Sequence, residues 1–242
     1  MNIRAVILVP SQGHHAQQFH WSARALRSSV YGGHALVVNV EVIAPKDYNP
    51  TYQGLNNFQV KLRTDHGKAF SFADHRNLSS MLTISHAATG DGPNMAAGVG
   101  GYQPWAAYDA FGRDGNPWGG AGGSAISSDA AAVCSSVTLS CQGDPDAGPP
   151  RRPFTFSALR PKARAFWEEI GRSLRGDGKI ILIGCNLGAG QYIDHVANAS
   201  GHPTYGARAP FSAADVKTVV RVVRGIERGV AFEPMRKAMP EH

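Results

Sequence analysis

Two apolar segments, each running into a reactive side chain and a glycine-rich turn, constrain the fold of this chain most strongly. Residues 179–190 read Lys-Ile-Ile-Leu-Ile-Gly-Cys-Asn-Leu-Gly-Ala-Gly, so an apolar run ends in Gly184 and Cys185. Residues 80–94 read Ser-Met-Leu-Thr-Ile-Ser-His-Ala-Ala-Thr-Gly-Asp-Gly-Pro-Asn and bring His86 to a loop rich in glycine and proline. Short apolar runs bounded by turn residues are typical of strands buried on both faces. Ligands bind at the carboxyl ends of strands in open α/β sheets, so we expect Cys185 and His86 at that edge.

The rest of the chain alternates between strand and helix patterns. We expect strands over residues 3–9, 35–43, 58–62, 70–72 and 203–207, and helices over 11–26, 157–174, 192–199 and 215–228. The last segment is rich in valine, which suits a strand as well as an amphipathic helix capped by Ser212, and both interpretations stay open. The alternation predicts one α/β domain with a mainly parallel sheet and helices on both faces.

The composition changes sharply at about residues 98–153, where glycine, proline and small residues dominate. A helical turn over 103–111 is the one regular element that we expect there. A segment of this length without strong periodicity is typical of a functional insertion. We therefore treat it as an insertion within a single domain that covers 1–242.

Composition and charge exclude several classes of protein. The chain has 242 residues, of which 43% are hydrophobic and 17% charged, which is typical of a globular domain. No apolar run approaches the roughly 18 residues that would span a bilayer. The first ten residues are typical of a strand and not of a signal peptide, so we expect a cytoplasmic location or export without a signal peptide. The net charge is +6, but the cations are spread along helices without a groove-reading motif, which argues against nucleic-acid binding.

Three cysteines leave one thiol over if two of them pair. Cys134 and Cys141 are close enough in sequence to close a small loop, and the alternative is two reduced cysteines in that loop. A disulfide there implies contact with an oxidising compartment. In either case Cys185 remains a free thiol.

The two strand-and-turn blocks, in this order, resemble the caspase-like cysteine peptidases (clan CD), which include caspases, clostripain-like and gingipain-like enzymes and self-processing domains of bacterial toxins. Their signature is an apolar strand ending in His-Gly, followed later by an apolar strand that ends in a small residue and the nucleophilic cysteine. Residues 81–86 match the first block and residues 180–185 the second. The resemblance covers the core but not the insertion, and it implies a caspase-like three-layer sandwich.

The resemblance also implies a mechanism. Cys185 attacks a peptide carbonyl, His86 handles the proton, and the backbone N–H groups of Ala87 and Cys185 hold the oxyanion. The family has glycine where this chain has Ala87, but alanine keeps the N–H donor provided that the turn does not require a positive φ. The separation between His86 and Cys185 is longer than the family pattern, which the insertion accounts for; the insertion is then a candidate for autoprocessing.

Other candidate site residues follow the first strand, lie in the loops after His86 and Cys185, or belong to the insertion. We expect the substrate pocket to include His14, Asp91, Trp105 and Asn186. His14, His15 and His20 follow the first strand, but their spacing matches no zinc pattern, and we expect neither a metal nor a cofactor.

One cofactor-binding alternative starts from the glycine-rich turn after Cys185, which superficially resembles an S-adenosylmethionine-binding turn. About fifty residues follow Gly190, too few for such a domain. A phosphate-binding loop is excluded because no Gly-Lys-Ser/Thr follows.

The sequence thus predicts a cysteine endopeptidase with a Cys–His dyad that acts on protein or peptide substrates. Autoprocessing and a role as a bacterial effector are further expectations. Two alternatives stay open: a catalytically inactive caspase-like binding module, and a thiol enzyme that acts on other amides. Retention of both His86 and Cys185 favours catalysis, whereas Ala87 slightly opposes it.

Overall fold

The computed structural model describes residues 2–11, 15–43, 59–87, 93–94, 141–143, 156–159, 161–185, 187–188, 192–230 and 232–241. Their main feature is a seven-stranded sheet with the order β11-β10-β9-β4-β1-β2-β3. The strands are β1 (Ala5–Pro10), β2 (Ala35–Ile43), β3 (Gln59–Thr64), β4 (Leu78–Ile84), β9 (Leu174–Ile183), β10 (Thr204–Ala207) and β11 (Met235–Ala238). The five inner strands run parallel, while β3 and β11 pair antiparallel at the two edges. The expected mainly parallel sheet is confirmed.

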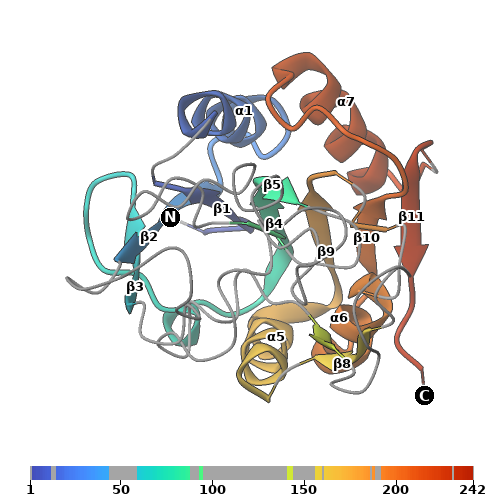
Figure 1. Cartoon of the computed structure of the whole chain (residues 1–242). Helices are drawn as coiled ribbons and strands as arrows, with labels where there is room; N and C mark the ends of the chain where they lie inside the picture. The colour runs from blue at the N-terminus through green and yellow to red at the C-terminus, as the bar shows by residue number, and fades with distance from the viewer. Residues whose placement is uncertain are drawn as a thin grey trace, which may run out of the picture.

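Two pairs of helices cover the two faces of the sheet (Figure 1). Helices α1 (Ala16–Ser29) and α7 (Val216–Glu227) lie side by side on one face, and α5 (Pro161–Ser173) and α6 (Tyr192–Ser200) lie side by side on the other. The inner strand β1 is buried along its whole length. Its alternate residues belong to two different cores: Ile7 packs with α1 and α7, whereas Val6 and Leu8 pack with α5 and α6. A strand buried on both faces explains why its sequence is continuously apolar.

Short strand pairs lie outside the main sheet. β5 (His86–Ala87) pairs with β6 (Pro93–Asn94), and β7 (Cys141–Gly143) pairs with β8 (Phe156–Leu159). Apart from Cys141–Gly143, the expected insertion at 98–153, including the helical turn expected over 103–111, lies outside the described residues.

The helix expected over 157–174 is shorter at its start than its sequence pattern predicted. It begins at Pro161, because proline suits the first helical position and disfavours a helical conformation in the residue before it. Residues Phe156–Leu159 form β8 instead. The strand β9 begins at Leu174, directly after the helix, and runs through Gly176 and Gly178.

Two further expectations need correction. Residues 70–72 do not form a strand: Phe72–Asp74 is a single 3-10 turn, η2, in which the Ser71 hydroxyl accepts from the Ala73 N–H. The valine-rich segment forms the helix α7, so the strand interpretation was wrong, and its N-cap is Asp215 instead of Ser212. The Asp215 carboxylate reaches two free N–H groups of the first turn, those of Lys217 and Thr218, which is the role of an N-cap.

The C-terminal strand β11, which the sequence did not predict, closes the sheet beside β10. Within the described segments, none of the helices is long and apolar enough to cross a membrane.

Candidate functional site

The backbone register brings the ends of β4 and β9 to the same level of the sheet. The two strands are parallel neighbours, and Ile84 lies opposite Ile183 as their last pair. The Ser85 N–H donates to the Ile183 carbonyl at 3.1 Å, which extends the pairing by one step. His86 and Cys185 each stand two residues beyond this last pair. Adjacent parallel strands lie about 4.8 Å apart, so the two backbones are neighbours at the carboxyl edge.

The chain leaves the main sheet just after Ser85. His86 and Ala87 form β5, which pairs with β6 instead of continuing beside β9. The structure describes the backbone of these two residues, and their side chains lie outside the described part. Ala87 is not among the described residues with positive φ, so alanine fits this position without backbone strain.

The thiol of Cys185 is partly buried, and it meets the backbone of a distant segment. Its Sγ lies 3.4 Å from the Phe211 carbonyl oxygen, to which the thiol donates, and 3.4 Å from the Phe211 nitrogen, whose N–H donates to sulfur. Of the described cysteine side chains, Cys185 is a free thiol. A backbone N–H directed at sulfur also offers a donor to any negative charge that develops there.

The segment that carries Phe211 is held firmly in place. The Phe211 ring is buried in the core between the sheet and the α1–α7 layer. Two residues further on, the Ala213 carbonyl accepts a hydrogen bond from the buried Ser22 hydroxyl of α1 at 3.2 Å. At its start, the Arg208 N–H donates to the Pro234 carbonyl at 3.0 Å. The position of the amide that faces the thiol is therefore fixed by the fold on both sides.

The turn after Cys185 is also pinned. Leu187 is buried in the core on the α5–α6 face. The Gly188 N–H donates to the Ala207 carbonyl at 2.8 Å, and a Cβ at Gly188 would lie 2.2 Å from the Gly206 carbonyl oxygen. The backbone of this turn thus lies directly against β10, and only glycine fits at 188.

The histidines after β1 lie next to a different groove. His20 lines a hollow of about 780 Å³ between α1 and the β2–β3 edge, beside Asn39 and Asp65. Burial lowers the pKa of His20, and the neighbouring Asp65 partly offsets this. His15 is the N-cap of α1 in a left-handed conformation, with its ring edge-on to Phe19. Among the described residues, no three His, Cys, Asp or Glu side chains gather so as to hold a metal ion.

Several predicted site residues lie outside the described residues. These are His14, Asp91, Trp105 and Asn186 of the expected substrate pocket, and Cys134 of the expected disulfide. Their roles stay predictions.

Sequence reasoning missed Phe211, because its contact with Cys185 uses backbone atoms and no side-chain type marks it. A signal was nevertheless available. The segment 208–214 follows β10, the next parallel strand after β9, so it starts at the same carboxyl edge as Cys185.

No family model matches this chain, and no curated protein matches it. A solved structure with some similarity is a secreted C11 cysteine protease from Bacteroides thetaiotaomicron in complex with an irreversible peptide inhibitor. The two chains are 10% identical with a TM-score of 0.35, and the match covers 90% of this chain and 56% of the protease. This chain thus spans little more than half the length of that protease. A similarity this low establishes neither a shared fold nor a shared activity.

Proposed function

We propose that this chain is a caspase-like cysteine peptidase in which Cys185 is the nucleophile and His86 the proton carrier. The observation that carries the proposal is the common register of β4 and β9, in which both residues follow the Ile84–Ile183 pair by two positions. Adjacent parallel strands lie about 4.8 Å apart, so residues that follow their last pair by two positions start close enough for an imidazole to reach a thiol.

The proposed reaction is acyl transfer in two steps. The Cys185 sulfur forms a bond to the peptide carbonyl carbon while its proton passes to His86. The carbon–nitrogen bond then breaks, the leaving amine takes that proton, and water hydrolyses the thioester. Backbone N–H groups at Ala87 and Cys185 are the proposed donors to the oxyanion, and the Phe211 N–H supports negative charge on sulfur.

The substrates that fit this chemistry are proteins or peptides. The 98–153 segment lies between the two catalytic blocks in sequence, so we include it as a substrate for self-cleavage. Amides other than a peptide backbone are the second substrate class, since the same thiol chemistry acts on them.

The first test is labelling with a peptide acyloxymethyl ketone, followed by intact-mass analysis. We expect a single adduct on the wild-type chain and none at this position in Cys185→Ala. His86→Ala should slow the labelling by about a hundredfold or more, as for loss of a general base. Two matched controls should label like the wild type: His34→Ala, which changes an exposed histidine, and the double variant Cys134→Ser/Cys141→Ser.

Turnover is the second readout. Cleavage of a peptide library, or of the chain itself, should fall by about a thousandfold or more in Cys185→Ala. If Cys185 reacts no faster than free cysteine and every substrate stays intact, the peptidase proposal is wrong, and the inactive binding module takes its place.

A further inference from the structure

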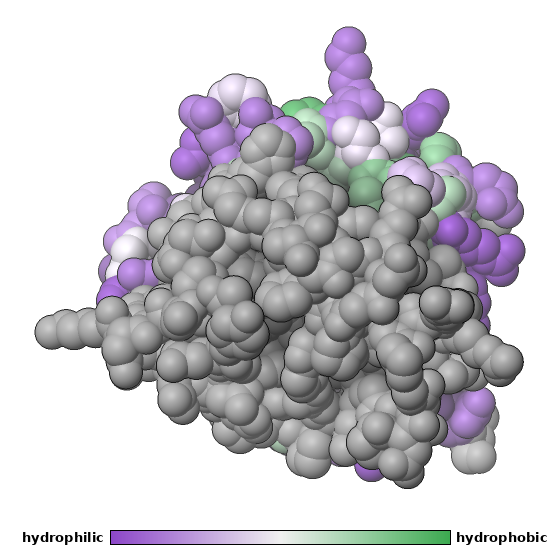
Figure 2. All heavy atoms as spheres, viewed as in Figure 1, coloured by the Kyte–Doolittle hydropathy of each residue, from purple (hydrophilic) through white to green (hydrophobic). Residues whose placement is uncertain are grey.

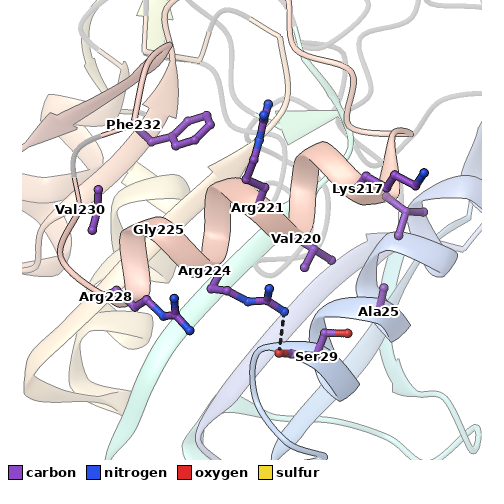
Figure 3. Close-up of a pocket in the computed structure, with 11 residues that line it drawn as sticks. Ala25, Ser29, Lys217, Val220, Arg221, Arg224, Gly225, Arg228, Val230 and Phe232 are labelled. Carbon is purple, nitrogen blue, oxygen red and sulfur yellow. Dashed lines mark hydrogen bonds between the residues drawn. The ribbon is translucent and has the colours of Figure 1, made fainter.

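The outer layer formed by α1 and α7 carries a surface groove that the proposed chemistry does not use. The groove has a volume of about 550 Å³. We call it the α1–α7 groove; the residues that matter for its binding properties are Lys217, Arg221, Arg224, Arg228, Val220 and Phe232. Figure 3 shows the outer surface of α7 as its floor, with α1 on one side and the segment of Val230 and Phe232 on the other.

The cations of the groove form one stripe. Lys217, Arg221, Arg224 and Arg228 are spaced by four, three and four residues, which places them on a single face of the helix. With a rise of 1.5 Å per residue, the stripe is about 16 Å long. Like charges at this spacing repel one another along the helix, and negative charges on a partner would offset that repulsion.

No carboxylate among the described lining residues neutralises this stripe. The facing helix α1 contains no Asp or Glu. Glu227, at the end of α7, binds Tyr31, Ser80 and Lys179. The exposed Asp215 carboxylate caps the first turn and lies near Lys217; hydrogen bonds from Thr218 first, and the charge of Lys217 in smaller part, lower the pKa of Asp215. Lys217 thus has a carboxylate nearby, whereas no carboxylate among the described lining residues faces Arg221, Arg224 or Arg228.

The groove also has apolar surface between its cations. Val216, Val220, Val230 and Phe232 line it, and the Val230 side chain is 57% exposed. Arg221 lies over the Phe232 ring, 5.1 Å from its centroid, and Arg224 donates across the groove to the Ser29 carbonyl at 3.1 Å. Figure 2 shows hydrophobic residues at the top of the molecule, over α1 and α7, flanked by hydrophilic ones.

We propose that the α1–α7 groove binds an acidic amphipathic helix of a partner protein, about three turns long. The cationic stripe matches carboxylates repeated every three or four residues, and the valines and Phe232 match apolar side chains between them. Nucleic acid would leave the apolar surface without a partner. A membrane surface fits less well, since the apolar residues line a hollow between two walls instead of protruding.

The experiment uses a 16-residue fluorescent peptide with Glu at every third or fourth position and Leu next to each Glu, so that the two residue types lie on adjoining sides of one helix. Anisotropy is measured with the Cys185→Ala chain so that proteolysis cannot interfere. We expect saturable binding that weakens as salt increases. A scrambled peptide of the same composition should bind at least tenfold more weakly. Equal binding of the two peptides overturns the proposal.

Charge reversal tests the location. Lys217→Glu/Arg228→Glu should weaken binding by at least tenfold, while Lys68→Glu/Arg172→Glu, an equal charge change on exposed residues outside the groove, should leave it within twofold. If Lys217→Glu/Arg228→Glu unfolds at a lower temperature than the parent chain, Lys217→Ala/Arg228→Ala replaces it. We then expect peptide affinity to fall by at least threefold. Equal loss in groove and control variants overturns the proposal. Tighter, groove-dependent binding of phosphatidylserine vesicles or single-stranded RNA also overturns it, in favour of that ligand.

Discussion

His202 shows how much of the packing depends on a single buried side chain. Its Nδ1 lies 3.2 Å from the Gly178 carbonyl of β9, and its Nε2 lies 3.1 Å from the Gly171 carbonyl of α5. The residue itself follows α6. One imidazole ring therefore ties the segment after α6 to α5 and β9, which adjoin in sequence.

We predict that His202→Ala lowers the free energy of unfolding by about 2–4 kcal/mol, because it opens a cavity and leaves two buried carbonyls without this contact. The matched control is His34→Ala. That ring is exposed, with its Nδ1 3.1 Å from the Asn2 carbonyl oxygen, so its loss should cost less than about 0.5 kcal/mol. Urea unfolding of both variants measures the difference, and equal losses would contradict the role of His202.

At the scale of elements, the contact of α5 with the end of α6 depends on Gly171. A Cβ at this position would lie 2.0 Å from the Ser200 carbonyl oxygen, which is backbone and cannot turn aside. The absence of a side chain lets the two helices approach closely over the same face of the sheet.

Gly171→Ala should therefore destabilise the chain by about 1–3 kcal/mol, although alanine favours a helix more than glycine does. Gly176→Ala is the control, because nothing lies within 4 Å of a Cβ there. Thermal unfolding followed by circular dichroism should show a clear fall in Tm for the first variant only. If Gly171→Ala instead raised the Tm, then α5 and α6 would be able to move apart without a loss of stability, and the close contact would not matter.

The elements were predictable where local pattern and burial agree. The strand at 35–43 has the predicted bounds because its valine-rich run is buried between helices. The helix predicted over 157–174 was placed too early at its start. The apolar spacing continues across this region, but the helix begins only at Pro161. β11 was missed since its four residues carry no alternation, and its strand conformation comes from pairing with β10.

At the scale of the molecule, a polar cluster joins the layers near the amino ends of the strands. Glu227 accepts hydrogen bonds from Tyr31 at 2.7 Å and Ser80 at 2.5 Å, and its other oxygen lies 3.4 Å from the Lys179 Nζ. These residues come from α7, the turn after α1, and the strands β4 and β9. Burial first, and then the charge of Glu227, raises the pKa of Tyr31 well above its ordinary value of 10.0.

This shift predicts a loss of stability in alkali. The folded chain holds Tyr31 neutral while the unfolded chain ionises it above about pH 10, so stability is full below that pH and falls as pH rises towards the folded pKa. One such group can lower the free energy of unfolding by up to about 1.4 kcal/mol for each unit of pH in this range. At pH 8 the free energy of unfolding of Tyr31→Phe should be about 1 kcal/mol lower than that of the wild type. Between pH 10 and 11 it should fall by less than that of the wild type. Urea unfolding at both pH values tests this, and parallel losses in the two proteins would contradict it.

The candidate site was predictable only in part. An apolar run before His86 and another before Cys185 predict strand ends, and the parallel sheet aligns them. The sequence does not reveal which strands are neighbours or how they are registered, because pairing depends on the whole fold. For the same reason, the Phe211 amide beside the thiol was not predictable from residue type.

The antiparallel strands at the two edges bear on how the molecule avoids self-association. Within the described part of the chain, β3 and β11 are the outermost strands, and each carries an exposed lysine, Lys61 on β3 and Lys237 on β11. Arg63 and Arg236 are paired with Glu41 and Asp194, and the end of β3 is already covered where the Phe70 N–H donates to the Leu62 carbonyl. An unpaired strand edge is a template for another chain, and lysine at such an edge opposes that pairing. Two copies that met edge to edge would bring like charges together in any combination of these strands. Part of the chain's positive charge thus protects its sheet from growing into a larger one.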